Sequence, residues 1–169
     1  MIRICLHGVE STGKSVMTAR LGLPFVAEYG RTWCEERGTD LTMADLLAIA
    51  EGHAAATRAA MAQDPPVLIL DTDQLMTAAW AQMLFGQVPA ALLAYPRADL
   101  YLLFAPDVPW VEDGTRFFGS PAERARFAQI AEDMLVRAGV PFRRISGNWA
   151  EREAQVRAAI AEAVVGAAV

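Results

Sequence analysis

The chain has 169 residues, of which 54% are hydrophobic and 21% charged, a composition that suits one compact domain and excludes a disordered chain. Its formal net charge of −5 argues against a broad nucleic-acid-binding surface, and no apolar run reaches the roughly 20 residues that a membrane span needs. Cys5 and Cys34 lie in no metal-type spacing. We therefore expect reduced thiols in a cytoplasmic protein without nucleic-acid or membrane partners.

Short apolar runs, typical of buried strands, alternate along the chain with segments whose apolar residues recur at helical spacing. The predicted strands are 2–7, 24–28, 67–71, 99–104 and 141–146. The predicted helices are 14–21, 32–37, 42–62, 72–85, 89–94, 121–138 and 148–165. This alternation predicts an α/β fold, in which a five-stranded parallel sheet carries helices on both faces and one domain spans residues 1–169.

The first predicted strand runs directly into the sequence GVESTGKS, residues 8–15, which fits the phosphate-binding P-loop pattern G-x-x-x-x-G-K-S. Glycine allows backbone angles that let the N–H groups of such a loop converge on a phosphate, next to the positive end of the following helix. We expect this loop to bind ATP, with Mg²⁺ held partly by the hydroxyl of Ser15. The expected ATP-binding residues are Gly8, Val9, Glu10, Ser11, Thr12, Gly13, Lys14, Ser15 and Val16.

Lys14 is the only lysine in the chain, and the other 14 basic residues are all arginine. An ammonium group is a compact point charge that can lie along the loop and contact two phosphates, whereas a guanidinium group is wide and planar. The position of this single lysine therefore favours a role in phosphate transfer.

Carboxylates follow two of the predicted strands, where ligands bind in open parallel sheets. Glu28 ends strand 24–28, and Asp71 ends strand 67–71, with Asp73 two residues later. Glu28 and Asp71 are candidates for the base that activates an attacking hydroxyl, and Asp71 also for a Mg²⁺ ligand. The alternative for Asp71 and Asp73 is that they cap the next helix. Arg31, at a helix start, indicates an anionic or polar ligand, or else a surface pair with Glu35.

A polar connection with glycine and proline, about residues 106–124, predicts a lid over the transferred phosphate. Arg116 lies in this loop and is the strongest candidate for stabilising the charge of the transition state. Arg124 and Arg126 lie at helical positions, where at least one is expected to be solvated. Trp110 either stacks on a flat ring of the substrate or anchors the lid.

Four further side chains are not assigned to the site. We expect His7 to be packed rather than catalytic, and His53 to be structural or partly exposed. Trp80 and Met83 lie at the helical spacing of core residues.

Several motifs occur together in one order: GVESTGKS, EYGR at 28–31, DTD at 71–73, and PWVEDGTR at 109–116 followed by GSPAERARFAQIAEDML. This combination resembles the ribosylnicotinamide kinase domain of NadR-type NAD-biosynthesis proteins. The resemblance implies a fold like the nucleoside kinases, with ATP and Mg²⁺ as cofactors. It also implies phosphorylation of nicotinamide riboside at its 5′-hydroxyl to give nicotinamide mononucleotide.

The resemblance, with the residues above, defines the expected site. The expected catalytic residues are Lys14, Glu28, Asp71 and Arg116, and the expected metal ligands are Ser15 and Asp71. The expected substrate-binding residues are Glu28, Tyr29, Arg31, Asp73, Trp110 and Asp113.

The sequence departs from the pattern of this family at Ala27, where the family pattern has an aromatic residue. It also lacks a nucleotidyltransferase signature, so we expect a stand-alone kinase. Two alternatives stay open: a kinase for another nucleoside or a nucleoside monophosphate, and a P-loop ATPase or nucleotide switch without a metabolite acceptor. The sequence does not indicate an oligomeric state.

Overall fold

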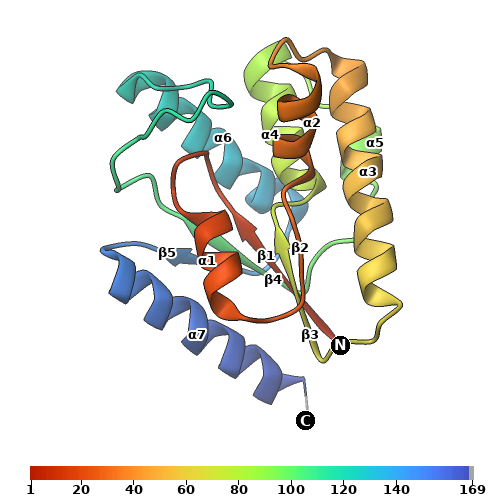
Figure 1. The fold of residues 1–169 in the computed structure, drawn as a ribbon, viewed down its shortest axis with the longest axis vertical. Helices are drawn as coiled ribbons and strands as arrows, with labels where there is room; N and C mark the ends of the chain where they lie inside the picture. The colour runs from red at the N-terminus through yellow and green to blue at the C-terminus, as the bar shows by residue number, and fades with distance from the viewer. Residues whose placement is uncertain (168–169) are drawn as a thin grey trace.

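The computed structural model describes residues 1–167 and shows a three-layer α/β fold around one parallel sheet (Figure 1). The last two residues of the expected domain, 168 and 169, lie outside the described residues. Neighbouring strands pair in parallel in the order β2-β3-β1-β4-β5, which confirms the predicted sheet. The strands are β1 (Ile2–His7), β2 (Phe25–Val26), β3 (Val67–Asp71), β4 (Leu100–Phe104) and β5 (Phe142–Ile145).

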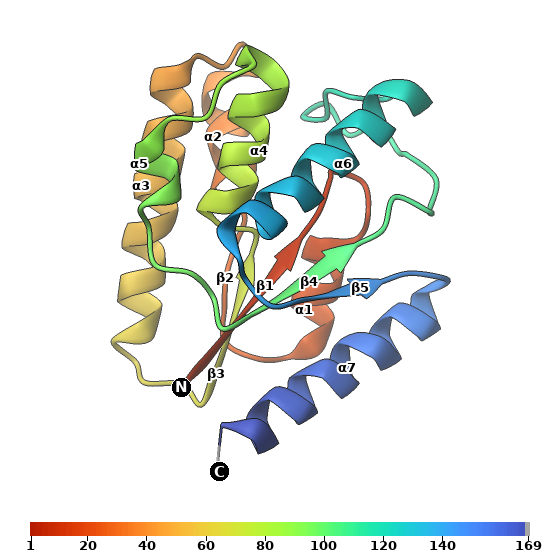
Figure 2. The same ribbon diagram turned by 180° about the vertical axis from the view of Figure 1, so that it is seen from behind.

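Helices cover both faces of this sheet, as the sequence predicted. They are α1 (Lys14–Leu21), α2 (Tyr29–Arg37), α3 (Met43–Met61), α4 (Gln74–Phe85), α5 (Ala90–Leu93), α6 (Pro121–Ala138) and α7 (Trp149–Gly166). One core layer packs α1 and α7 against the sheet, through residues such as Met17 and Val156. The opposite layer packs α4 and α6 through Leu75 and Leu135, and α6 crosses in front of the sheet in Figure 2.

Capping side chains set where most of the helices begin. The hydroxyl of Thr42 accepts a hydrogen bond from the backbone N–H of Asp45, whose carboxylate bonds back to Thr42, so α3 begins as predicted. The carboxylate of Asp73 accepts a hydrogen bond from the N–H of Leu75, so α4 begins at Gln74 and not at residue 72.

The predicted bounds of the second strand and second helix were wrong. Strand β2 has only two residues, and α2 begins at Tyr29, three residues earlier than predicted. Glu28 is consequently the residue before the first turn of α2 and not the end of a strand. The error arose because FVAE has the composition of a strand, while β2 lies at the edge of the sheet and pairs over two residues only.

The sheet order places β1 and β3 side by side, with Leu6 in register with Asp71. The loop of residues 8–13, which follows β1, therefore lies next to the carboxyl end of β3. This edge of an open parallel sheet is where such folds bind ligands.

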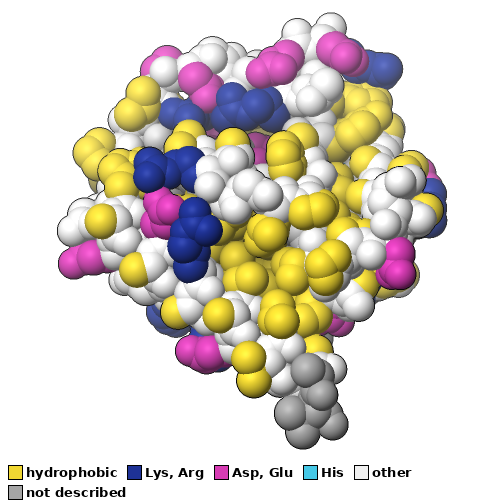
Figure 3. Space-filling view, turned by 60° about the horizontal axis from the view of Figure 1, so that its bottom comes forward, with side chains coloured by type: hydrophobic (Ala, Val, Ile, Leu, Met, Phe, Trp, Pro, Cys, Tyr) yellow, Lys and Arg dark blue, Asp and Glu magenta, His cyan; other side chains and the backbone are white. Residues whose placement is uncertain are grey.

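One side of the molecular surface carries a group of hydrophobic side chains. Figure 3, which brings the lower side of Figure 1 forward, shows hydrophobic side chains gathered at the centre of that side, with arginine side chains beside them. Exposed apolar side chains of the chain include Val16 on α1, Phe25 on β2 and Val165 on α7. Within residues 1–167, no helix is both long enough and apolar enough to cross a membrane.

Candidate active site

The GVESTGKS loop adopts backbone angles that require its glycines. Gly8 has φ 127° and Gly13 has φ 85°, both in the region that L side chains rarely adopt. A Cβ atom on Gly8 would also lie 2.7 Å from the carbonyl oxygen of Phe104. The loop is closed on itself by the hydroxyl of Thr12, which donates to the carbonyl oxygen of Val9 at 2.8 Å. The loop is therefore preformed to surround a phosphate group.

Lys14 lies inside this loop, with only 6% of the residue exposed. Its Nζ donates a hydrogen bond to the carbonyl oxygen of Val9 at 2.7 Å. Burial lowers the pKa of Lys14, while the nearby Glu28 and Asp71 carboxylates raise it. The ammonium group thus has a narrow, mostly buried position, which fits lysine better than the forked guanidinium group of arginine.

A buried arginine that the sequence analysis did not single out supports the same loop. Arg152 on α7 is fully buried, and its guanidinium donates to the carbonyl oxygens of Gly147 at 2.8 Å, Ala105 at 3.1 Å and Thr12 at 3.3 Å. It also pairs with Asp107. The residue therefore ties the loop to the ends of β4 and β5. Arg152 occupies a helical position, and its sequence context does not distinguish it from a surface arginine.

Trp149, the first residue of α7, is a second functional candidate that the sequence analysis missed. Its indole packs directly on Gly13, where an added Cβ would lie 2.1 Å from the ring, yet 48% of Trp149 is exposed. A half-exposed aromatic face beside the phosphate loop suits contact with a flat, uncharged ring. Only the loop geometry brings residues 13 and 149 together, so no local pattern could have indicated the contact.

The connection between β4 and α6, residues 105–120, contains most of the lid expected over about 106–124 and lies against the phosphate loop. Residues 121–124 belong to α6. One oxygen of the Glu10 carboxylate accepts hydrogen bonds from the N–H groups of Phe117 at 2.8 Å and Phe118 at 2.7 Å. The hydroxyl of Ser11 accepts a hydrogen bond from the N–H of Val111 at 2.8 Å. Glu10 and Ser11, at positions where the motif allows any residue, thus hold the lid segment. The glycines of the loop and Lys14 leave the expected phosphate position open.

The arginines of the lid have different surroundings. Arg116 lines the central cavity, donates to the hydroxyl of Ser11 at 3.2 Å and pairs with Asp113 at 3.1 Å. Arg124 is buried and donates to the carbonyl oxygen of Ser11 at 3.1 Å, whereas Arg126 is exposed. Arg116 is therefore the lid arginine that faces the site, and Arg124 fastens the loop.

A cavity of about 530 Å³ connects the phosphate loop with a chamber between α2, α3 and α4. Its polar lining includes Lys14, Ser15, Glu28, Arg31, His53, Asp73, Asp113 and Arg116, and its apolar and aromatic lining includes Tyr29, Leu46, Met76, Trp80 and Phe117. A volume of this size suits a small organic molecule such as a nucleoside beside the phosphates of a nucleotide.

The two carboxylates expected to be catalytic have raised pKa values. Burial raises the pKa of Glu28, and the neighbouring Lys14 ammonium opposes that shift. Burial likewise raises the pKa of Asp71, against the effect of Lys14 and of the Ser15 hydroxyl. Glu28 lines the cavity and lies 3.8 Å from Arg31, so it is the carboxylate that an acceptor can reach.

Asp71 lies deeper than Glu28 and is only 3% exposed. Among the residues that the structure describes, its Oδ1 atom has no hydrogen-bond partner. A buried carboxylate oxygen beside the hydroxyl of Ser15 is a pair of hard oxygen donors of the kind that Mg²⁺ binds, directly or through water. The two residues therefore fit the metal ion that the P-loop motif implies.

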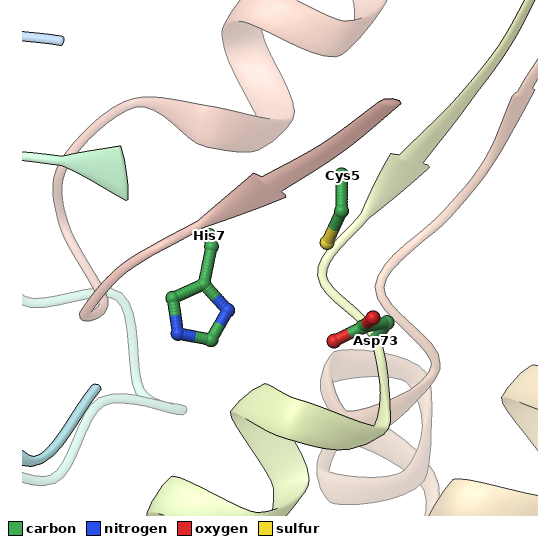
Figure 4. A group of neighbouring side chains, drawn as sticks. All are labelled: Cys5, His7 and Asp73. Atoms are coloured by element: carbon green, nitrogen blue, oxygen red, sulfur yellow. The ribbon is translucent and has the colours of Figure 1, made fainter. Parts of the chain in front are cut away.

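Asp73 belongs to a different buried cluster, shown in Figure 4. Its two oxygens accept hydrogen bonds from the N–H of Leu75 at 2.9 Å and from the hydroxyl of Tyr101 at 2.5 Å. Cys5 and His7 of β1 point toward it, and their ligand atoms and that of Asp73 all lie within 4.8 Å of one another. Burial raises the pKa of the Cys5 thiol, and Cys5 and Cys34 are both free cysteines. The hydrogen bond from Tyr101 to Asp73 ties β4 to the start of α4.

The structure brings most of the expected site residues to one cavity. Of the expected substrate-binding residues, Trp110 is absent from the described lining; its ring packs on Gly119 and so anchors the lid. Arg31 pairs with Asp113 at 3.0 Å and not with Glu35. His53 is buried rather than partly exposed, and it lines the cavity. Trp80 also reaches the cavity from its aromatic cluster.

Comparisons with known proteins agree with this geometry. A family model described as an AAA domain matches residues 3–152. Two curated relatives, from Escherichia coli (strain K12) and Salmonella typhimurium (strain LT2), are each described as a trifunctional NAD biosynthesis/regulator protein NadR. They are 32% identical over 153 and 150 residues, which cover 84% and 82% of this chain and 37% of each relative. The chain therefore spans little more than a third of the length of these relatives.

Among solved structures, the thymidylate kinase from Ehrlichia chaffeensis is similar in fold, with a TM-score of 0.62. The match covers 94% of this chain and 98% of that chain, at 11% sequence identity.

Proposed function

The chain belongs to the AAA domain family and has a P-loop kinase fold, and from its site we propose that it transfers the γ-phosphate of ATP to the 5′-hydroxyl of nicotinamide riboside. The product would be nicotinamide mononucleotide. The observation that carries the proposal is a single cavity that joins the phosphate loop to an aromatic chamber with a carboxylate at the junction. The NAD-biosynthesis role in the name of the 32% identical relatives supports this acceptor.

In this proposal, the loop N–H groups and Lys14 bind the phosphates of ATP, and the N-terminus of α1 adds its positive dipole. Ser15 and Asp71 would hold Mg²⁺, which neutralises charge on the phosphates when bound. Arg116 faces the same space from the lid and stabilises the charge of the transferred group.

Glu28 is proposed to orient the 5′-hydroxyl and accept its proton. It lines the cavity next to the phosphate loop, and its raised pKa makes it a better proton acceptor than an ordinary, fully solvated carboxylate. Asp71 was the other candidate from the sequence, but its contact with the Ser15 hydroxyl favours the metal-binding role.

The charges around the cavity favour a nucleoside over a nucleoside monophosphate. Arg31 on α2 lines the cavity, and it already pairs with Asp113 at 3.0 Å and lies 3.8 Å from Glu28. A monophosphate would have to compete with these carboxylates for Arg31, whereas nicotinamide riboside carries no phosphate and does not. Tyr29, Trp80 and Phe117 supply aromatic walls on which a flat cationic ring can pack.

The test measures ADP release with ATP and Mg²⁺, with and without nicotinamide riboside, beside a panel of nucleosides and nucleoside monophosphates. The proposal predicts strong stimulation by nicotinamide riboside. Stimulation by a different acceptor would reassign the substrate. Release that is independent of every acceptor would instead indicate an ATPase or a nucleotide switch.

A further inference from the structure

His53 is a buried polar side chain that the proposed reaction does not yet use. It lies on α3, is 3% exposed and lines the cavity. In the described part of the chain its Nε2 atom has no hydrogen-bond partner. An unpartnered buried nitrogen costs free energy unless a ligand supplies the missing bond, so its persistence in a cavity wall indicates a ligand contact.

The neighbours of His53 indicate which ring nitrogen carries the proton. The side-chain nitrogen of Gln74 donates to the carbonyl oxygen of Ala50 at 3.0 Å, and lies 3.5 Å from Nδ1 of His53. The hydroxyl of Thr57 also lies 3.4 Å from Nδ1, and it donates to the carbonyl oxygen of His53 at 2.8 Å. An amide nitrogen can only donate, whereas a hydroxyl oxygen can donate or accept, so we assign Nδ1 as the acceptor and place the proton on Nε2. Burial lowers the pKa of His53 to about 4, so the ring is neutral near pH 7. Nε2–H is thus a neutral donor without a partner.

Glu28 and His53 line the same cavity, so a nucleoside whose 5′-hydroxyl lies at Glu28 can direct its ring toward His53. The ring of Tyr29 packs on Gly52, the residue before His53, where an added Cβ would lie 2.3 Å from the ring. Met76 and Trp80 of α4 line the same cavity. A planar ring placed among these side chains would have its substituents near α3.

We propose that His53 determines acceptor specificity: its Nε2–H donates a hydrogen bond to a carbonyl oxygen carried by the ring of the acceptor. This inference rests on the proposed function, in which that oxygen is the carboxamide oxygen of nicotinamide riboside. A site built to bond such a group discriminates against an analogue that lacks it, because the donor is then left unpaired.

The test compares two acceptors, nicotinamide riboside and the riboside of unsubstituted pyridine, which has the same charge and sugar but no carbonyl group. Wild-type protein should show a kcat/KM about 10-fold to 100-fold higher for nicotinamide riboside. His53→Phe, which keeps a planar ring but has no donor, should bring the ratio of the two acceptors close to one. His53→Gln, which restores an N–H donor at a similar reach, should recover part of that ratio.

A merely structural role for His53 would change both acceptors by the same factor. Met76→Leu is the matched control, since it alters the same cavity while conserving volume and should leave the ratio of the two acceptors as in the wild type. A second readout needs no variant: the side-chain ¹⁵N resonances of His53 should shift when nicotinamide riboside binds and move less with pyridine riboside.

The outcomes separate this inference from the proposed function. Turnover of both ribosides with equal kcat/KM in the wild type, or an unchanged ratio in His53→Phe, would overturn the role of His53 alone. Failure of the wild type to phosphorylate either riboside would overturn the proposed function and this inference with it. If His53→Phe does not fold, the ¹⁵N shifts decide, and equal shifts with both ribosides overturn the inference.

Discussion

The phosphate loop and the acceptor chamber share one cavity but differ in how their polar groups are satisfied. In the loop, Thr12 and Lys14 bond to the carbonyl oxygen of Val9, and Arg152 bonds to that of Thr12. Toward the chamber and beneath it, Nε2 of His53 and Oδ1 of Asp71 have no partner within residues 1–167. The side chains of the loop thus have partners within the protein, and its backbone N–H groups are the ones proposed to bind phosphates. The chamber and the proposed metal position instead carry side-chain atoms that a ligand can satisfy.

The largest effect is expected from changing the loop. Lys14→Ala should lower kcat on the order of 1,000-fold, because it removes the charge proposed to contact the transferred phosphate. Lys14→Arg should also be severely impaired, since the buried position beside Val9 does not fit a planar fork. Acceptor-stimulated ADP release measures both. Near-normal turnover of Lys14→Arg would contradict the explanation given for the single lysine.

The next largest effect distinguishes the roles of Glu28 and Asp71, which lie between the phosphate loop and the acceptor chamber. Glu28→Gln and Asp71→Asn should each lower kcat on the order of 100-fold or more. Asp71→Asn should in addition raise the Mg²⁺ concentration needed for half-maximal activity, because it weakens a metal ligand, and Glu28→Gln should not. A shift in Mg²⁺ dependence for Glu28→Gln alone would reverse the two assignments.

Arg152 supports the loop structurally, so changing it should lower the stability of the fold. Arg152→Ala should lower the free energy of unfolding by about 3 kcal/mol, since it removes a fully buried guanidinium with several partners. Urea unfolding followed by circular dichroism measures the loss. Arg157→Ala, on the exposed side of the same helix, is the control and should leave the midpoint close to that of the wild type. Equal urea midpoints for the two variants would show that Arg152 does not stabilise the fold.

The smallest effect concerns the chamber and depends on pH. The pKa of His53 is lowered to about 4, so the unfolded chain, with an ordinary pKa near 6.5, takes up the proton first as the pH falls. The wild type should therefore lose stability relative to His53→Gln below pH 6.5, by about 2 kcal/mol at pH 5. His7, whose pKa is also lowered, is present in both proteins and cancels. Parallel stability curves between pH 7.5 and pH 5 would show that His53 is not held neutral by burial.

The contrast between the phosphate loop and the acceptor chamber also explains which features the sequence predicted. Residues 8–15 are contiguous, and their chemistry requires particular residue types at fixed spacing. The predicted strand before them and helix after them were confirmed. The parallel sheet followed from the alternation of apolar runs with helical patterns. The start of α2 was mispredicted because an edge strand of two residues leaves no distinct pattern.

The acceptor chamber was harder to predict because α2, α3, α4 and the lid each contribute one or a few side chains. His53 and Trp80 look like ordinary helix residues, and only their packing turns them toward the cavity. Trp149 and Arg152 reach the loop from a helix more than 130 positions away in the chain. Tryptophan is a residue type that often stacks on flat rings, yet Trp110 packs on Gly119 within the lid.

The central claim is transfer of phosphate from the loop to an acceptor in the chamber. It is tested most directly by incubating the protein with γ-labelled ATP, Mg²⁺ and nicotinamide riboside, with Lys14→Ala as the blank, and identifying the labelled product by mass spectrometry. The account predicts label on the 5′-oxygen of the riboside, as nicotinamide mononucleotide, in the wild type only. Label released solely as inorganic phosphate, at the same rate with and without the riboside, would contradict it.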